Sequence, residues 1–288
     1  MEHSKNIETF IACDAEYTDA RVALFGAPFD GTASYRPGSR FAPRAIRSES
    51  FGLETYSPYQ DRDLTALSVF DGGDLELPFG NPKKALSLIE AYVSLLLRDE
   101  KRPVMLGGEH LVTLGAVRAV AKKYPGLCVL HLDAHTDLRD EYLGETLSHA
   151  TVMRRVWEIV GDGKLFQFGI RSGEKHEFEF ARAHTELHAF DLNGWRDVID
   201  RLAGHPVYVS LDLDILDPSV LPGTGTPEPG GIGFCALLNA VTGLSGLHIV
   251  GGDVTELSPN YDPSGISTAA ACKILRELLL AMGEAPVK

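Results

Sequence analysis

The chain has few cysteines, few basic residues relative to acidic ones, and no long apolar run. Four cysteines occur among its 288 residues. They lie far apart and form no CxxC pair: Cys13, Cys128, Cys235 and Cys272. This spacing argues against a disulfide framework and against a cysteine zinc site. The formal net charge of −13 argues against a nucleic-acid partner, because an acidic surface repels phosphates.

Membrane insertion and secretion are not expected from the sequence either. No stretch supplies the roughly 20 uninterrupted apolar residues that a membrane helix requires. Residues 1–20 contain Glu, Lys, Asp and Asn without a sustained apolar segment, unlike a typical signal peptide. We therefore expect a cytoplasmic protein. Because 44% of the residues are hydrophobic and 23% are charged, we also expect a large buried core.

Short apolar runs bounded by Gly, Pro or Asp alternate with helical patterns along the chain. The runs cover residues 21–26, 67–71, 103–106, 127–133, 164–170, 187–191, 206–213 and 247–254. Helical patterns lie between most of them, for example at residues 85–98 and 266–282, whereas residues 29–60 look irregular. This alternation predicts an α/β protein with a mainly parallel sheet in a single domain, residues 1–288. The pattern leaves both an open sheet and a closed barrel possible.

Acidic residues and histidines are dense where three of the expected strands end. The candidate metal ligands are His110, Asp133, His135, Asp137, Asp212 and Asp214. Ligands of open parallel sheets bind just beyond the carboxyl ends of the strands, so three separate segments can converge there. Side chains two residues apart on an extended chain project to the same side, which would aim Asp133, His135 and Asp137 at one point.

A cluster of this kind requires cations. Four carboxylates held close together would repel one another and shift one another's pKa unless positive charge neutralised them. Oxygen and imidazole donors without a thiolate suit Mn²⁺, with Fe²⁺, Co²⁺ or Zn²⁺ as alternatives. We therefore expect two Mn²⁺ ions, which would lower the pKa of a shared water towards neutrality and make it a nucleophile for hydrolysis.

These segments resemble the ureohydrolase family, which includes arginase, agmatinase and related guanidino hydrolases. The motifs are GGEH at residues 107–110, DAHTD at 133–137, SLDLDILDP at 210–218 and GTGTPEPGG at 223–231. GAPFD at residues 26–30 and SYRPGSRF at 34–41 resemble the agmatinase branch specifically. The resemblance spans nearly the whole chain. It implies a three-layer α/β/α fold around an eight-stranded, mainly parallel sheet, and a homo-oligomer, often a trimer or hexamer.

The resemblance also implies roles for individual side chains. One Mn²⁺ would be held by His110, Asp133, Asp137 and Asp212, and the other by His135, Asp133, Asp212 and Asp214. Asp133 and Asp212 would thus bridge the two ions. Asp137 is expected to accept the proton of the nucleophile, and His149 resembles the proton-shuttling histidine of the family. Glu256 matches the glutamate that grips the guanidinium as a bidentate, charge-assisted pair.

Three polar residues near these motifs are assigned supporting positions. His131 shares the strand face of Asp133 but lies deeper, which predicts a hydrogen-bonded core histidine. Asp217 and Asp253 are expected to be turn residues or to support the ligands from behind. We expect the loop at residues 223–231 to fix the backbone beside the site, since it lacks the lysine of a phosphate-binding loop.

The substrate implied by the resemblance is a small cationic guanidino compound, cleaved to urea and an amine. Agmatine, which would give putrescine, ranks first, with aminopropylagmatine and guanidinobutyrate as alternatives. Arg139, Asp140 and Glu141 stand where arginase carries polar residues for an amino-acid head group, which argues against arginine. Asp140 or Glu141 could attract an ammonium, whereas Arg139 could bind a carboxylate. A pseudoenzyme that only binds a guanidino ligand is the alternative of a different class, and the complete ligand set disfavours a single-metal deacetylase.

Overall fold

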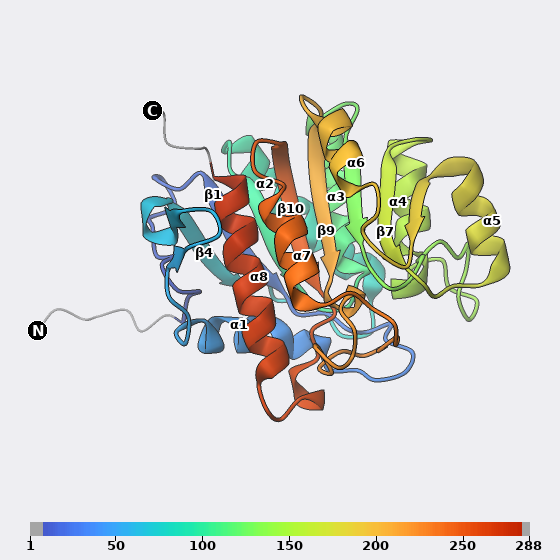
Figure 1. The fold of residues 1–288 in the computed structure, drawn as a ribbon, viewed down its shortest axis with the longest axis horizontal. Coiled ribbons are helices and arrows are strands. Elements are labelled where there is room, and N and C mark those ends of the chain that lie inside the picture. The colour runs from blue at the N-terminus through green and yellow to red at the C-terminus, as the bar shows by residue number, and fades with distance from the viewer. Residues whose placement is uncertain (1–7, 284–288) are drawn as a thin grey trace, which may run out of the picture.

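An open, eight-stranded sheet forms the centre of the molecule (Figure 1), in a computed structural model that describes residues 8–283. In chain order the strands are β1 (Val22–Ala27), β4 (Val69–Asp74), β5 (Arg102–Gly107), β6 (Cys128–Leu132), β7 (Leu165–Ile170), β8 (Glu186–Ala189), β9 (Pro206–Asp212) and β10 (His248–Thr255). Their order across the sheet is β4-β1-β5-β10-β9-β6-β7-β8, and every pairing between neighbours is parallel. The predicted eight-stranded parallel sheet is confirmed, and the barrel alternative is wrong because β4 and β8, at the two ends of this order, do not pair with each other.

Helices cover both faces of this sheet and make the predicted three-layer sandwich. They are α1 (Ala42–Ser50), α2 (Pro82–Arg98), α3 (Val112–Lys123), α4 (Val152–Val160), α5 (Lys175–His184), α6 (Trp195–Leu202), α7 (Phe234–Thr242) and α8 (Ile266–Met282). In Figure 1, α7 and α8 lie in front of the sheet and α2 and α3 behind it. Alternate residues of β1 enter two separate cores, Val22 and Leu24 on the α8 side and Ala23 and Phe25 on the α2 side.

Local sequence signals explain where the helices begin and end. The predicted helix at residues 85–98 is α2, which begins one turn earlier because the Asn81 side chain accepts a hydrogen bond from the Lys84 N–H and Pro82 occupies the first turn. The predicted helix at residues 266–282 matches α8 at both ends. The irregular segment expected at residues 29–60 contains α1, which the prediction missed although Pro43 stands in its first turn.

The sheet order brings four strand ends together. β5, β10, β9 and β6 are consecutive neighbours, so the loops that follow them leave from the middle of one edge. These loops, together with Asp212 at the end of β9, carry all the candidate ligands and Glu256. None of the helices within residues 8–283 is long and apolar enough to cross a membrane. The ends of the predicted domain, residues 1–7 and 284–288, lie outside the described residues.

Candidate metal centre

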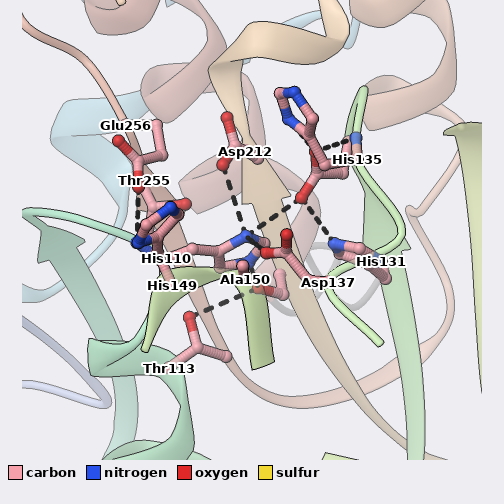
Figure 2. A network of polar contacts seen from close by, with 12 residues as sticks. His110, Thr113, His131, His135, Asp137, His149, Ala150, Asp212, Thr255 and Glu256 are labelled. Carbon is pink, nitrogen blue, oxygen red and sulfur yellow. Dashed lines mark hydrogen bonds and ion pairs between the residues drawn. The ribbon is translucent and has the colours of Figure 1, made fainter. Parts of the chain in front are cut away.

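The six predicted ligands converge at the carboxyl ends of β5, β6 and β9. Figure 2 shows four of them, His110, His135, Asp137 and Asp212. His110 Nδ1 lies 3.0 Å from Asp133 Oδ2, 3.1 Å from Asp137 Oδ2 and 3.3 Å from Asp212 Oδ2. Neighbouring donor atoms around one octahedral ion with bonds of about 2.1 Å would lie about 3 Å apart. The spacing of these four donor atoms therefore fits a common divalent ion.

A second set of donors lies beside the first and shares one carboxylate with it. His135 Nδ1 is 3.0 Å from Asp214 Oδ2 and 3.5 Å from Asp133 Oδ1. The two oxygens of Asp133 thus face different histidines, which is the arrangement that a bridging carboxylate requires. Asp212 is less symmetric, because its Oδ2 faces His110 while its Oδ1 accepts a hydrogen bond of 2.8 Å from the Asp214 N–H.

The local backbone differs from the extended chain on which the spacing argument was based. β6 ends at Leu132, so residues 133–137 form a loop, and Asp137 returns to the cluster through a positive φ of 52°. Asp212 ends β9 and caps the 3-10 turn Leu213–Ile215, which contains Asp214. Positive φ is uncommon for a residue other than glycine and carries strain. Side-chain alternation along a strand is therefore not what gathers these carboxylates.

Burial makes the cluster electrostatically demanding. The side chains of Asp133, Asp212 and Asp214 are at most 2% exposed. Burial, together with the charges of Asp214 and Asp133, raises the pKa of Asp212 well above its usual range. Burial and the Asp133 charge raise the pKa of Asp137 to about 7. Burial alone would also raise the pKa of Asp133, but the histidines around it, His131 first, hold that pKa well below normal.

The hydrogen bonds behind His110 indicate what faces the carboxylates. Ser210 Oγ donates to Asp253 Oδ1 at 2.8 Å, so it accepts from His110 Nε2–H at 2.9 Å. In the neutral ring, Nδ1 then carries a lone pair, and this buried atom has no hydrogen-bond partner. A lone pair aimed at three carboxylate oxygens is repelled unless a proton or a metal ion lies between them, so these residues fit a metal ion.

Within residues 8–283, two groups of potential ligand atoms lie close together, and both contain Asp133. The groups are His110, His131, Asp133 and Asp137, and Asp133, His135 and Asp214. His131 thus belongs to the first group by distance, whereas Asp212, a predicted ligand of both ions, belongs to neither group. As predicted, this histidine is fully buried and hydrogen-bonded, with Nε2 at 2.8 Å from Asp133 Oδ2.

His149 and Glu256, the two predicted catalytic side chains that are not ligands, line the same cavity of about 260 Å³ as His110, His135, Asp137, Asp212 and Asp214. The His149 ring contacts Ser34 Oγ through Nε2 and Ser148 Oγ through Nδ1, each at 3.3 Å. Burial lowers the pKa of His149 to about 4, so the imidazole is neutral at pH 7. It can therefore donate a proton only after it has accepted one, which differs from the unperturbed pKa assumed from the sequence.

Glu256 is held by the chain segment that carries the first ligand. It follows β10 and has a positive φ of 63°. Its Oε1 accepts a hydrogen bond of 2.8 Å from the backbone N–H of His110. Burial, and next the charge of Glu109, raises the pKa of the Glu256 carboxyl well above its usual range. A cation that entered the cavity beside Glu256 would stabilise the ionised carboxylate and lower its pKa. The expected guanidinium is such a cation.

The predicted supporting residues occupy the expected kinds of position. Asp217 accepts hydrogen bonds from the backbone of Ser219, Gly230 and Gly231, so it is a turn residue that joins two loops. Asp253 is fully buried and accepts from Tyr208 and Ser210, directly behind His110.

Buried Glu109 and half-buried Arg171 received no role from the sequence. Glu109, inside the GGEH motif, accepts from the N–H and hydroxyl of Thr32, and the Thr32 hydroxyl in turn accepts from the His149 N–H. Burial raises the Glu109 pKa to about 8. Arg171 donates to the carbonyls of Asp214 and Glu228 and so joins the ligand turn to the 223–231 loop. Glu109 could have been identified because it lies inside the GGEH motif. No local sequence pattern indicates a role for Arg171.

Comparison with known proteins agrees with this geometry. Residues 20–281 match the model of the arginase family. The chain is 49% identical over 277 residues to an agmatinase of Bacillus cereus, covering 95% of this chain and 96% of the relative. It is 38% identical over 261 residues to an N(1)-aminopropylagmatine ureohydrolase of Thermococcus kodakarensis, covering 87% and 88%. The solved structure of agmatine ureohydrolase of Thermoplasma volcanium superposes with a TM-score of 0.87 at 35% identity, covering 96% of this chain and 94% of that chain.

The family model spans nearly all of the described chain, and both the relatives and the solved structure cover most of its length. The chain therefore belongs to the arginase family of metal-dependent ureohydrolases.

Proposed function

We propose that the protein hydrolyses agmatine to putrescine and urea. The observation that carries this proposal is the convergence of six ligand side chains, His149 and Glu256 around one cavity. The 49% identity to an agmatinase supports agmatine over the substrates of more distant relatives. We further propose one catalytic domain over residues 1–288, and a homo-oligomer, trimer or hexamer, in the cytoplasm, as the family resemblance implies.

Two Mn²⁺ ions are the proposed cofactor, each held by four side chains. His110, Asp133, Asp137 and Asp212 would hold one ion, and His135, Asp133, Asp212 and Asp214 the other. The split of the Asp133 oxygens between the two histidines supports the bridging role of that residue. Oxygen and imidazole donors favour Mn²⁺ among the common divalent ions. When bound, two such ions lower the pKa of a water between them and supply the nucleophile at neutral pH.

Glu256 orients the substrate. Because the backbone N–H of His110 donates to Oε1, the Glu256 carboxylate has a defined direction before the substrate arrives. A guanidinium paired with it in this buried cavity is held by charge-assisted hydrogen bonds, which places its carbon near the ligand cluster.

Asp137 and His149 are the proton acceptor and the proton donor of the reaction. The Asp137 carboxylate faces the same cluster as His110 and lines the cavity, so it is placed to accept a proton from the nucleophile. His149, neutral at rest, can then take up a proton and deliver it to the amine that leaves the carbon. Ser34 Oγ and Ser148 Oγ hold the imidazole from both nitrogens and so keep it at the cavity wall.

The charges around the mouth of the cavity favour a cationic tail. Arg139 lines the cavity, but Glu174 at 3.1 Å and Glu177 at 3.5 Å already bind its guanidinium. These three side chains leave one excess negative charge there, which disfavours the carboxylate of guanidinobutyrate. Asp140, one of the two acids suggested by the sequence, instead pairs with Arg155 at the surface, and its side chain is 76% exposed.

A urea-release panel tests this proposal. The Mn²⁺-loaded protein would be assayed with agmatine, arginine, aminopropylagmatine and guanidinobutyrate, and we expect agmatine to give the highest kcat/KM. A higher value for another member of the panel would overturn the substrate assignment. No urea from any of them, at full metal occupancy, would support a protein that binds guanidino compounds without turning them over.

A further inference from the structure

His131 is a fully buried histidine whose two ring nitrogens both have partners. It lies on β6, two residues before Asp133, and belongs by distance to the first group of potential ligands. Nε2 is 2.8 Å from Asp133 Oδ2, and Nδ1 is 3.0 Å from Nε2 of Gln167 on β7. Distance alone would allow this histidine to be a metal ligand, so the positions of its hydrogens decide what it does.

Gln167 determines those positions through a second contact. Its Nε2 is also 2.9 Å from the carbonyl oxygen of Thr136, which can only accept a hydrogen bond. The amide group at this end of Gln167 must therefore be the NH₂, and its remaining N–H points at His131 Nδ1. The other end is consistent, because the Gln167 Oε1 accepts from the Thr185 hydroxyl at 3.0 Å.

A nitrogen that faces an N–H must offer its lone pair. His131 Nδ1 is therefore an acceptor, and an imidazolium is excluded because it would point one N–H at another. In the neutral ring the hydrogen then resides on Nε2, which donates to Asp133 Oδ2. Both nitrogens are used, so no lone pair remains for a metal ion.

We propose that His131 is a positioning residue, a hydrogen-bond donor to Asp133 whose tautomer is set by Gln167. The inference rests on the proposed metal centre and adds a role for a residue outside the six ligands. The His131 N–H takes one of the two lone-pair directions of Asp133 Oδ2 and leaves the other for the ion beside His110. Oδ1 remains directed at His135, so the carboxylate is held in its bridging orientation.

His110 shows the opposite outcome of the same reasoning. The rings of the two histidines lie 5.1 Å apart in one polar cluster. At His110 the Nε2–H is given to Ser210, and the unpartnered Nδ1 faces the carboxylates. At His131 the Nδ1 is occupied by Gln167, and the protonated Nε2 faces the carboxylate. The hydrogen-bond partners on the far side thus distinguish a ligand from a positioning residue.

Metal-binding measurements on three variants test the proposal. We expect His131→Leu to weaken Mn²⁺ binding, measured by calorimetric titration with the metal alone, about 10- to 100-fold while two ions still bind at saturation. His131→Gln places an amide N–H near the position of Nε2 and should restore most of the affinity. His188→Leu is the matched control, because His188 also contacts a carboxylate, Glu186, but lies on β8 away from the ligands; it should bind as the unchanged protein does.

Two outcomes would overturn the proposal. Unchanged affinity in His131→Leu would mean that the N–H does nothing for Asp133. Loss of one ion at saturation in both His131 variants would make His131 a ligand. If the unchanged protein itself bound no metal, the proposed function would fail, and the tautomer would still be open to a separate test.

That separate test measures the tautomer in the unchanged protein and uses His131→Gln only to assign signals. Solid-state ¹⁵N NMR of histidine-labelled protein, metal-free and loaded with diamagnetic Zn²⁺, distinguishes protonated from unprotonated ring nitrogens. The His131 signals are those missing from His131→Gln. We expect an unprotonated Nδ1 and a protonated Nε2 in both states. A protonated Nδ1, or an Nε2 that becomes unprotonated when Zn²⁺ binds, would refute the assignment.

Discussion

Replacing Glu256 by Gln separates charge from shape at the guanidinium site. The Oε1 of Glu256 accepts from the His110 N–H, so the oxygen of a glutamine must occupy the same place. The amide NH₂ would then point into the cavity, where a guanidinium presents only donors. The variant thus loses the negative charge, and the N–H of its amide also faces an N–H of the guanidinium.

The expected magnitude follows from burial. Glu256 is 8% exposed, and removing one partner of a buried charge pair costs about 3–5 kcal/mol. At about 1.4 kcal/mol per tenfold, kcat/KM for agmatine should fall between about 100-fold and about 4,000-fold. The free enzyme should not lose stability, because burial and the charge of Glu109 already disfavour the ionised Glu256 carboxylate.

Steady-state urea release measures the effect, with metal content determined on the same samples. Glu179→Gln is a suitable control, since Glu179 lies on the outer face of α5, where it pairs with Lys175. Its kcat/KM should be unchanged. A Glu256→Gln enzyme that holds two ions and retains kcat/KM within tenfold of the unchanged protein would refute the guanidinium role.

Three further outcomes are expected. Asp133→Asn should lower the content of both ions and abolish urea release; two tightly bound ions with normal turnover would contradict the bridging assignment. His149→Asn should reduce kcat far more than metal content, and a normal rate would remove His149 from the proton path. Hydrogen bonds from Ser264 and Ser267 outweigh the effect of burial and hold the Asp262 pKa at about 2, below its ordinary value of 3.8. Asp262 therefore stabilises the fold above about pH 4, and this stabilisation is lost as the pH falls through 2. Asp262→Ala should lower the free energy of unfolding by at most about 2 kcal/mol at pH 7, measured by denaturant unfolding. The difference between the variant and the unchanged protein should shrink towards pH 2.

Strand ends and the members of the polar cluster could be predicted because both are local in the sequence. Each run of buried apolar residues ends at a polar motif, so the edge at which the motifs meet follows from the parallel sheet alone. The motif at residues 133–137 identified Asp133, His135 and Asp137 correctly as neighbours of one point, although for the wrong reason. A positive φ at Asp137, which alternation along a strand does not foresee, turns that side chain back to the cluster.

The substrate-tail region could not be predicted because its partners are distant in sequence. Arg139 was open to a carboxylate in the sequence, but Glu174 and Glu177, more than thirty residues later, neutralise it. Asp140 follows Arg139 directly and still points away, towards Arg155 on α4. Proximity to a motif therefore indicated the right loop without indicating which of its charges faces the cavity.

Hydrogen-bond direction is the other property that sequence could not supply. His131 was expected to be a hydrogen-bonded core residue, and it is, but its tautomer depends on Gln167 and on the carbonyl of Thr136. Gln167 lies on a different strand, and its side chain carries no motif. Only the three-dimensional arrangement tells His131 from the ligand His110.

Anomalous X-ray scattering at the manganese edge, from crystals grown with Mn²⁺, tests the central claim most directly. The account predicts two peaks per chain, one among His110, Asp133, Asp137 and Asp212 and one among His135, Asp133, Asp212 and Asp214. A single peak, or peaks outside these six side chains, would contradict it.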